Sequence, residues 1–221
     1  MKDFIVSSAV SLVFLLVLLL SAGRADYMAA WVYFGVSLLT NALRCFILRG
    51  QRELSQERLR PGSGAEEWDK RLLGIGFLLT IATLILAGLD AGRFGWTPRQ
   101  SWIWMAIGTF VTLIGAGLFL WAMAENRFFS AVVRIQRDRS HRVCETGPYR
   151  IVRHPGNTGM IIGTLGLPLL FGSAWSTIPT LLAVVLLIVR TRLEDALLER
   201  ELAGYDAYQR QTRYRLMPGV W

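Results

Sequence analysis

Two clusters of polar residues in the second half of the chain carry side chains that bind small charged molecules. The first cluster, at 141–155, contains both histidines of the chain, His141 and His154, and a Gly-Pro-Tyr turn at 147–149. The second cluster, at 190–195, has the sequence Arg-Thr-Arg-Leu-Glu-Asp and directly follows an apolar stretch. Arginine binds a carboxylate through two parallel hydrogen bonds, and acidic side chains can hold an ammonium group or ribose hydroxyls.

Each motif has an ordinary structural explanation when it is taken alone. A histidine beside a membrane boundary is usually interfacial, the Gly-Pro pair predicts a turn, and Pro155 suits the first turn of a helix. Arg190 and Glu194 are four residues apart, so a surface ion pair on one helix would explain them. The chemical interpretation therefore depends on whether the chain brings the two clusters together.

The apolar stretch between the clusters, 158–189, predicts a helical hairpin that brings them together. Pro168 and the Gly-Ser pair at 172–173 interrupt it, and proline breaks a helix because it removes a backbone donor. We expect two helices of about 14–16 residues, shorter than the ~20 residues that cross a bilayer. Glycines at 159, 163 and 166 form a seam for close helix contact. Because a hairpin returns its ends to one side, the clusters should meet.

The combined cluster suits an adenosine cofactor with an amino-acid end. Tyr149 and His154 can flank a planar base, and backbone donors of the turn and of the following helix start can hold an anion. The Gly-Ile-Gly at 74–76 lacks the third glycine of a dinucleotide fingerprint, and no Walker loop occurs. Cys45 and Cys144 are too few for a disulfide framework or a zinc site. We therefore predict no metal, and a metal held by Cys144 with a histidine is the alternative.

Long uncharged stretches predict an all-α, polytopic integral membrane protein. Residues 4–22 and 101–124 carry no charge, and ~18 or more such residues in a row indicate a membrane-spanning helix. Together with 27–48 and 72–89 they give four spans, and the hairpin raises the number of membrane helices to five or six. A cleaved signal peptide is the alternative for the first span, but Asp3 and the lack of a small-x-small cleavage site argue against it.

The basic residues predict how the chain is oriented. Six of the 24 lysines and arginines fall in 49–71, seven in 125–157 and six in 190–221, whereas the turns on the other side hold few. By the positive-inside rule, these connections, both termini and the site face the cytoplasm. The same rule accounts for the net charge of +8, so we predict no nucleic-acid partner.

The chain divides into two regions on this interpretation. Residues 1–124 hold the four spans, and residues 125–221 form a cofactor-binding and catalytic region that includes the hairpin at 158–189. Between the last span and the histidines, 126–137 is predicted to extend the fourth helix out of the membrane.

Spaced elements across about 135–221 resemble the isoprenylcysteine carboxyl methyltransferase family, and related phospholipid and thiol methyltransferases share the pattern. The matching residues are His141, Val143, Thr146 to Arg150, Arg153 to Pro155, Gly159, Arg190, Arg192, Glu194, Asp195, Gly204, Tyr205, Tyr208 and 213–221. The resemblance implies that S-adenosylmethionine binds in a cytosolic pocket, that S-adenosylhomocysteine is the product, and that a lipophilic acceptor arrives from the bilayer.

The resemblance also assigns roles to residues. It implies a cofactor site formed by His141, Val143, Gly147, Pro148, Tyr149, Arg153, His154, Pro155 and Glu194. Arg190 and Glu194 would be the catalytic residues, nearest the transferred methyl group. Two positions depart from the family's pattern: Asn157 stands where tyrosine is usual, which removes an aromatic wall, and Asp195 replaces the second of two glutamates.

The expected function is methyl transfer to a lipophilic acceptor, in the first place an isoprenylcysteine-type carboxylate and alternatively a phospholipid amine or a thiol. An ionised carboxylate needs no base, and Arg190 would hold it in line. An amine or thiol must lose a proton, for which Glu194 is the candidate base.

Two alternatives of other classes stay open. One is an NADPH-dependent membrane reductase of the sterol type, which has a similar C-terminal region. The other is a transporter or scaffold, although transporters usually carry polar groups near the middle of several spans. Here the polar residues gather at one face, and nothing in the sequence indicates an oligomeric state.

Overall fold

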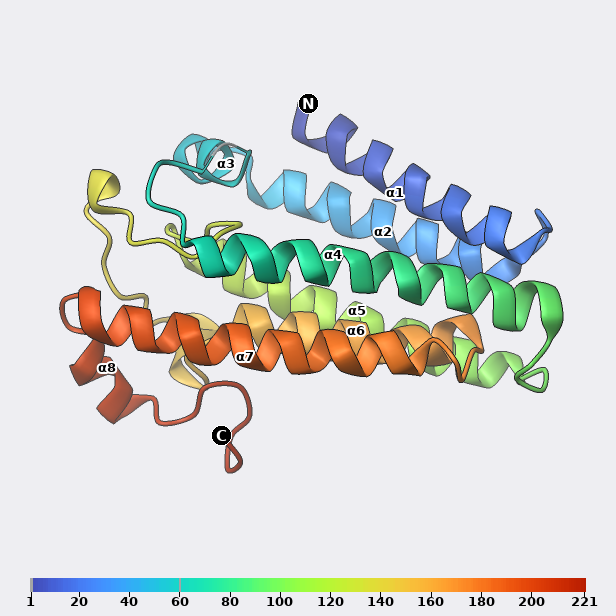
Figure 1. Ribbon diagram of the computed structural model, residues 1–221. Helices are drawn as coiled ribbons and strands as arrows, with labels where there is room; N and C mark the ends of the chain where they lie inside the picture. The colour runs from blue at the N-terminus through green and yellow to red at the C-terminus, as the bar shows by residue number, and fades with distance from the viewer. Residues whose placement is uncertain (1, 60) are drawn as a thin grey trace.

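Stretches rich in leucine, isoleucine, valine and alanine form the long helices of the computed structural model, which describes residues 2–59 and 61–221 (Figure 1). The helices are α1 (Lys2–Ala22), α2 (Met28–Ile47), α3 (Arg52–Leu59), α4 (Glu67–Ala87), α5 (Trp102–Glu125), α6 (Pro155–Phe171), α7 (Thr177–Glu201) and α8 (Tyr205–Gln211). A π-helical segment, η1 (Gly88–Phe94), continues α4, and short 3-10 turns lie at Arg137–Arg139 (η2) and Gly147–Arg150 (η3). The described residues contain no strand, and the predicted all-α class is confirmed.

Four helical segments are long and apolar enough to cross a membrane, namely Phe4–Ala22, Met28–Ile47, Glu67–Phe94 and Trp102–Glu125. Many of their large apolar side chains are exposed, among them Leu20 and Phe110. Such an exposed apolar surface is costly in water and favourable against lipid tails. The predicted polytopic membrane protein with four spans is confirmed.

The third span is longer than the sequence predicted. We expected a helix over 72–89 followed by an outer turn, but α4 and η1 together run from Glu67 to Phe94. Asp90 explains why the helix continues beyond 89, because its buried carboxylate binds both the chain that follows η1 and the turn between α6 and α7. It accepts hydrogen bonds from the backbone nitrogen of Thr97 (2.6 Å), the hydroxyl of Thr97 (2.7 Å) and the hydroxyl of Ser173 (2.6 Å). A buried charge with these partners is tolerated, and it ties η1 to the turn between α6 and α7.

The predicted hairpin is present as α6 and α7, joined by residues 172–176. Its helices have 17 and 25 residues, more than predicted, and Pro168 lies inside α6 rather than in the turn. The first helix ends at Gly172 because the backbone there takes a φ of +67°, which only glycine adopts without steric cost. The second helix continues through Arg190 to Glu201, so the polar cluster at 190–195 lies on an unbroken helix.

The predicted seam of glycines packs α6 tightly against α5. A Cβ atom added to Gly115 of α5 would lie 2.2 Å from the backbone nitrogen of Gly163, and one added to Gly159 would lie 2.6 Å from the carbonyl oxygen of Gly115. No side chain fits at these distances, so the two backbones touch. This contact holds the first turn of α6, which follows His154, against the last turns of α5.

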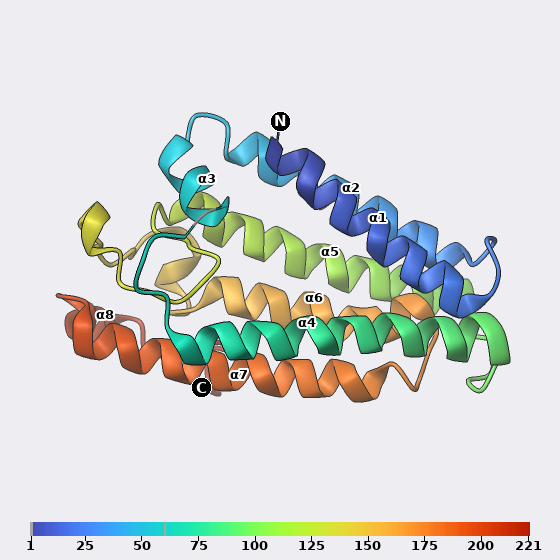
Figure 2. The ribbon, with the colours of Figure 1, turned by 45° about the horizontal axis from the view of Figure 1, so that its top comes forward.

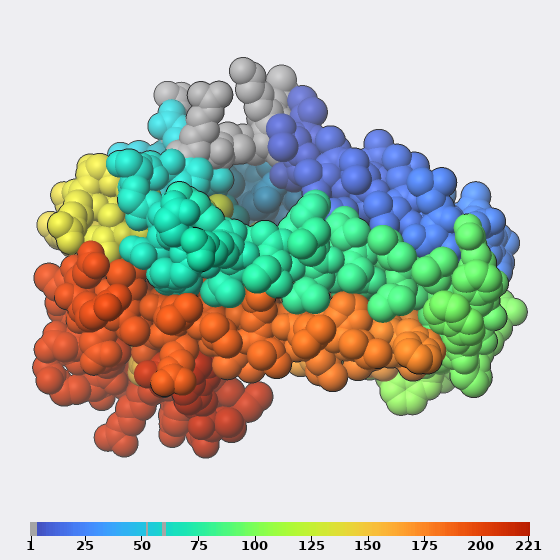
Figure 3. Space-filling model, viewed as in Figure 1, coloured from blue at the N-terminus to red at the C-terminus, as the bar shows by residue number. Residues whose placement is uncertain are grey.

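The three basic connections gather at one end of the bundle, here called the site end. Figures 1 and 2 show α3, α8 and the loop between α5 and α6 at this end, and the turns after α1, η1 and α6 at the other. Helix α4 packs against α7, and the two form one continuous face in the space-filling view (Figure 3).

The predicted helical extension over 126–137 is wrong. Helix α5 ends at Glu125, and the chain then runs irregularly to η2. Asn126 ends the helix because its side-chain oxygen accepts a hydrogen bond from the backbone nitrogen of Phe128 at 2.9 Å. Further along, the backbone nitrogen of Val133 donates to Asp69 at 2.7 Å. These contacts tie the loop to the first turn of α4.

Candidate active site

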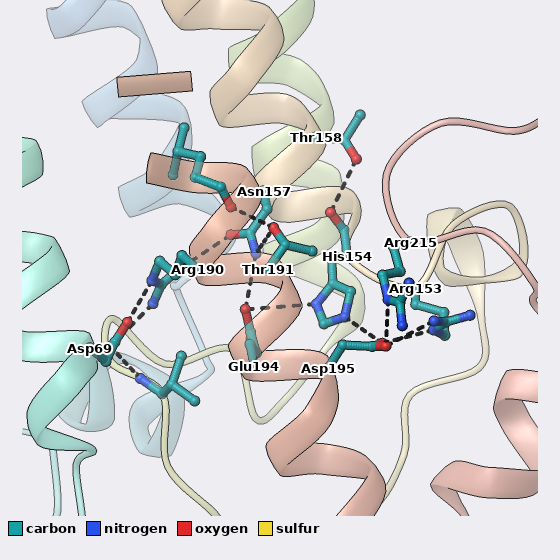
Figure 4. A network of polar contacts seen from close by, with 12 residues as sticks. Asp69, Arg153, His154, Asn157, Thr158, Arg190, Thr191, Glu194, Asp195 and Arg215 are labelled. Carbon is teal, nitrogen blue, oxygen red and sulfur yellow. Dashed lines mark hydrogen bonds and ion pairs between the residues drawn. The ribbon is translucent and has the colours of Figure 1, made fainter. Parts of the chain in front are cut away.

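Asp195 of α7 is the acceptor around which the two polar clusters meet (Figure 4). Arg153 binds both of its oxygens, at 2.8 and 2.9 Å, and the Nε of Arg215 donates to it at 2.7 Å. The hydroxyl of Tyr205 donates at 2.8 Å, and the Nε2 of His154 lies 3.0 Å away. The hairpin therefore does bring 141–155 to 190–195.

Asp195 stays ionised despite its burial. Burial by itself raises the pKa of this carboxyl, but the hydrogen bonds from His154, Arg153 and Arg215 outweigh it and hold the pKa far below its usual range. A carboxylate that binds protons so weakly is a poor base. Asp195 therefore acts as the fixed anchor that orients His154 and Arg153.

The C-terminal segment forms one wall of this cluster. The backbone nitrogens of Arg153 and His154 donate to the carbonyl oxygens of Tyr214 (2.9 Å) and Arg215 (3.0 Å). The hydroxyl of Thr158 donates to the carbonyl oxygen of Leu216 at 3.0 Å. These bonds fix the segment after α8 along the start of α6.

Arg190 is held by an acid that comes from the first half of the chain. Its Nε donates to Asp69 of α4 at 2.7 Å, and its Nη1 donates to the side-chain oxygen of Asn157 at 3.2 Å. Arg190 is 7% exposed and Asp69 is 0% exposed. An arginine has five N–H donors, so Arg190 keeps N–H groups on both terminal nitrogens for another ligand.

Glu194 is the least constrained acid of the cluster. One of its oxygens accepts a hydrogen bond from the Nδ2 of Asn157 at 2.9 Å and lies 3.7 Å from the Nδ1 of His154. Its side chain is 25% exposed. Asn157, which the sequence marked as the loss of an aromatic wall, thus joins Arg190 to Glu194 as a polar bridge, and its Nδ2 also donates to Thr191 at 3.1 Å.

A cavity of about 230 Å³ opens beside these groups. Seven of the residues expected to form the site line it, namely His141, Val143, Tyr149, Arg153, His154, Arg190 and Glu194. Gly147, Pro148 and Pro155, which were also expected at the site, are not among the lining residues. Gly147 has a φ of +55°, and a Cβ atom there would lie 2.8 Å from the carboxyl carbon of Glu125.

Aromatic groups line part of the cavity. The centre of the His141 ring lies 4.7 Å from the centre of the Phe128 ring. Burial, reinforced by the charges of Arg134 and Arg139, lowers the pKa of His141 to about 4. This imidazole is therefore neutral at neutral pH. Nearby, the hydroxyl of Tyr149 accepts a hydrogen bond from Asn126 at 3.2 Å.

Several residues of the site escaped the sequence analysis. Asp69 was not singled out, and its negative charge, opposite to the positive charge of Arg190, was the signal that could have linked the two residues. Tyr205 and Arg215 were matched to a family pattern without a role. Asn126 and Phe128 were placed on a helix that does not form. In the described part of the chain, no group of three or more His, Cys, Asp or Glu side chains is arranged to hold a metal ion.

Residues 103–203 match the family model of the phospholipid methyltransferases. This stretch begins in α5, includes the hairpin and contains both halves of the polar cluster. This stretch of the membrane protein is therefore similar to the phospholipid methyltransferases. The predicted resemblance to membrane methyltransferases is confirmed as a similarity of this stretch.

Two curated relatives carry a more specific name than the family model does. The chain is 28% identical over 108 residues to proteins called "Probable protein-S-isoprenylcysteine O-methyltransferase" from Oryza sativa subsp. indica and from Oryza sativa subsp. japonica. The aligned part is 48% of this chain and 56% of each rice protein. The chain therefore spans about half the length of the curated relatives it matches.

Proposed function

We propose that the protein transfers a methyl group from S-adenosylmethionine to a lipophilic acceptor, in the first place an isoprenylcysteine-type carboxylate. The observation that carries the proposal is the composition of one cavity. It is lined by the charged groups Arg190 and Glu194 and also by apolar side chains of three helices, Leu73 of α4, Phe119 of α5 and Met160 of α6. Such a cavity can receive a polar donor and an apolar acceptor together.

The residues of the cavity fit S-adenosylmethionine. Glu194 has one oxygen without a hydrogen bond among the described residues and offers a negative charge to a sulfonium or an ammonium group. Neutral His141 and the Tyr149 ring offer aromatic surfaces to a purine. Arg153 and His154 are held by Asp195 and form the fixed wall.

In the proposed reaction a bond forms between the methyl carbon and the acceptor atom while the carbon–sulfur bond breaks. The donor is already activated, so the protein mainly aligns the reactants, and orientation can contribute ~7–11 kcal/mol in favourable cases. With a carboxylate acceptor no proton leaves, and Arg190 holds the acceptor in line. With an amine or a thiol a proton must leave, and Glu194 accepts it.

We propose that the site end faces the cytoplasm. The three basic connections lie at that end, and basic loops favour the cytoplasmic side of a membrane. S-adenosylmethionine is made in the cytoplasm, which agrees with this orientation.

Isothermal titration of the detergent-purified protein with S-adenosylhomocysteine, and separately with NADPH, tests the donor. The proposal predicts saturable binding of S-adenosylhomocysteine and none of NADPH. Binding of NADPH alone would indicate a reductase, and binding of neither compound would favour a transporter or scaffold.

A further inference from the structure

Arg58 of α3 lines the same cavity and has no acidic partner in the described part of the chain. Its guanidinium carbon lies 5.7 Å from the centre of the Phe119 ring and 5.3 Å from that of Phe129. One long hydrogen bond, 3.5 Å, runs from its Nη1 to the carbonyl oxygen of Phe129. Most of its five N–H donors are therefore available to a ligand.

The environment of Arg58 disfavours an unpaired charge. Burial, reinforced by the positive charge of Arg44, lowers the pKa of Arg58 to about 10. The group is still protonated at neutral pH. A cation removed from water without an anion is costly, and two aromatic faces compensate only in part.

The acids near Arg58 are already engaged. Glu57 accepts hydrogen bonds from Arg134, at 2.8 and 2.7 Å, and from Ser130 at 2.8 Å. Glu53 is exposed and lies 3.4 Å from Arg127 on the surface. Neither carboxylate can neutralise Arg58 unless it leaves its present partner.

The other arginines that line the cavity either have an acidic partner already or are exposed to solvent. Arg190 is paired with Asp69, Arg153 with Asp195 and Arg134 with Glu57. Arg142 is exposed to solvent, where hydration weakens an ion pair. Arg58 is distinguished by being buried against aromatic rings and having no acidic partner among the described residues.

Arg58 also lies near the apolar part of the cavity wall. It contacts Phe119, and the cavity-lining Leu73 and Met160 lie about one helical turn beyond Asp69 and Asn157, farther from the site end. An acyl or prenyl chain that lies against Leu73, Phe119 and Met160 would bring its polar head toward Arg58.

We propose that Arg58 binds the anionic group, a carboxylate or a phosphate, of the lipophilic acceptor and thereby determines which acceptors the protein accepts. This inference rests on the proposed methyl transfer. A neutral acceptor leaves the desolvated guanidinium unpaired, so it binds more weakly. If the anion is the carboxylate that is methylated, the product is a neutral ester, which loses its attraction to Arg58 and is released.

The test compares Arg58→Gln with Arg49→Gln in detergent. Arg49 is a matched control because it is exposed, lies near the same connection, packs over the ring of Phe46 and does not line the cavity. The probes are N-acetyl-S-farnesylcysteine (a carboxylate), its carboxamide (neutral) and farnesyl phosphate. Their dissociation constants are measured with and without saturating S-adenosylhomocysteine.

The wild type and R49Q should bind at least one anionic probe more tightly than the carboxamide. In R58Q that preference should fall by about tenfold or more, because one charge-assisted hydrogen bond is lost. The affinities of R58Q for the carboxamide and for S-adenosylhomocysteine should stay the same as in the wild type. The anionic probe that R58Q loses identifies carboxylate or phosphate as the group. If R58Q is poorly folded, Arg58→Lys, which keeps the charge, should keep part of the preference.

Two results would overturn the inference. One is an anion preference that is absent from the wild type or unchanged in R58Q. The other is an equal loss of S-adenosylhomocysteine affinity in R58Q, which would place Arg58 in the cofactor site. Failure of the wild type to bind S-adenosylhomocysteine would instead count against the proposed function, whatever the probes do.

Discussion

Asp69 and Arg190 form an ion pair between α4 and α7, with 2.7 Å between Oδ1 and Nε. Both side chains are buried, so water cannot replace either partner. Asp69 lies outside the residues that match the phospholipid methyltransferase model. The first half of the chain therefore contributes a charged residue to the candidate active site, and the four spans do more than anchor the second half.

Replacing Asp69 with asparagine should destabilise the protein and impair methyl transfer. Loss of one partner from a buried ion pair typically costs ~3–5 kcal/mol because the other charge stays buried. Thermal unfolding in detergent and the rate of methyl transfer measure the two effects. Asp26→Asn is the control, because the Asp26–Arg24 pair is exposed. A D69N variant that is as stable and active as D26N would contradict the role of the pair.

Replacing Arg190 with alanine should reduce turnover more than affinity for S-adenosylhomocysteine. A lost donor to the reacting groups typically lowers turnover by about 10²–10³, whereas Glu194 and the aromatic walls still hold the product. The double variant D69N/R190Q removes the charge from both partners and controls for the buried charge that R190A leaves behind. Equal losses of turnover and affinity would make Arg190 a cofactor ligand instead.

Replacing Asn157 with leucine should disconnect Arg190 from Glu194. The change keeps the approximate volume and removes both side-chain hydrogen bonds to charged groups, which are worth ~1.5–3 kcal/mol each. We expect a fall in kcat/KM of about tenfold or more. An N157L protein with wild-type kinetics would mean that the bridge has no part in the reaction.

The stability of the folded protein should fall as the pH decreases from about 6.5 toward 4, and His141 should cause part of this fall. Its pKa is lowered to about 4 in the folded chain, compared with ~6.5 when unfolded. The unfolded state therefore binds a proton first, and stability present above pH 6.5 is lost as the pH decreases. Asp195 has a depressed pKa, so its contribution is present above the unfolded aspartate value of ~3.9 and is lost only below it. Melting temperatures at pH 7.5 and 5 should differ less in His141→Gln than in the wild type, and an unchanged difference would contradict this.

Replacing Gly115 with alanine should force α5 and α6 apart. The added methyl would lie 2.2 Å from the backbone of Gly163, and overpacking of this kind costs ~1–3 kcal/mol. Gly117→Ala on the same helix is the matched control, since no atom lies within 4 Å of its Cβ position. We expect a lower melting temperature for G115A alone. Similar melting temperatures for both variants would show that the seam is not close-packed.

The sequence was sufficient to predict that the four spans and the hairpin exist, because both depend on local patterns. Uncharged stretches mark the spans, and the glycine at 172 ends α6 whatever surrounds it. The meeting of Arg153 and His154 with Asp195 followed from the hairpin alone. These features need no knowledge of distant contacts.

The rest of the site depended on contacts between distant parts of the chain. The apolar residues of 126–137 have a spacing that a helix would also give, but the backbone of Val133 is bound to Asp69 of α4. In the sequence, Asp69 and Arg58 look like ordinary charged residues near helix ends. The tertiary structure shows that Asp69 pairs with Arg190 and that Arg58 lines a cavity. Asn157 differs from the residue that is usual in the family that the sequence resembles, and its hydrogen bonds to Arg190, Glu194 and Thr191 become visible only in the structure.

The most direct test of the central claim is the transfer of a labelled methyl group from S-adenosylmethionine to N-acetyl-S-farnesylcysteine by the purified protein. Phospholipid amines and long-chain thiols are offered in parallel. The account predicts a labelled lipid product with the wild type and a strong reduction with R190A. No labelled product from any of these acceptors, with a folded protein and saturating donor, would contradict it.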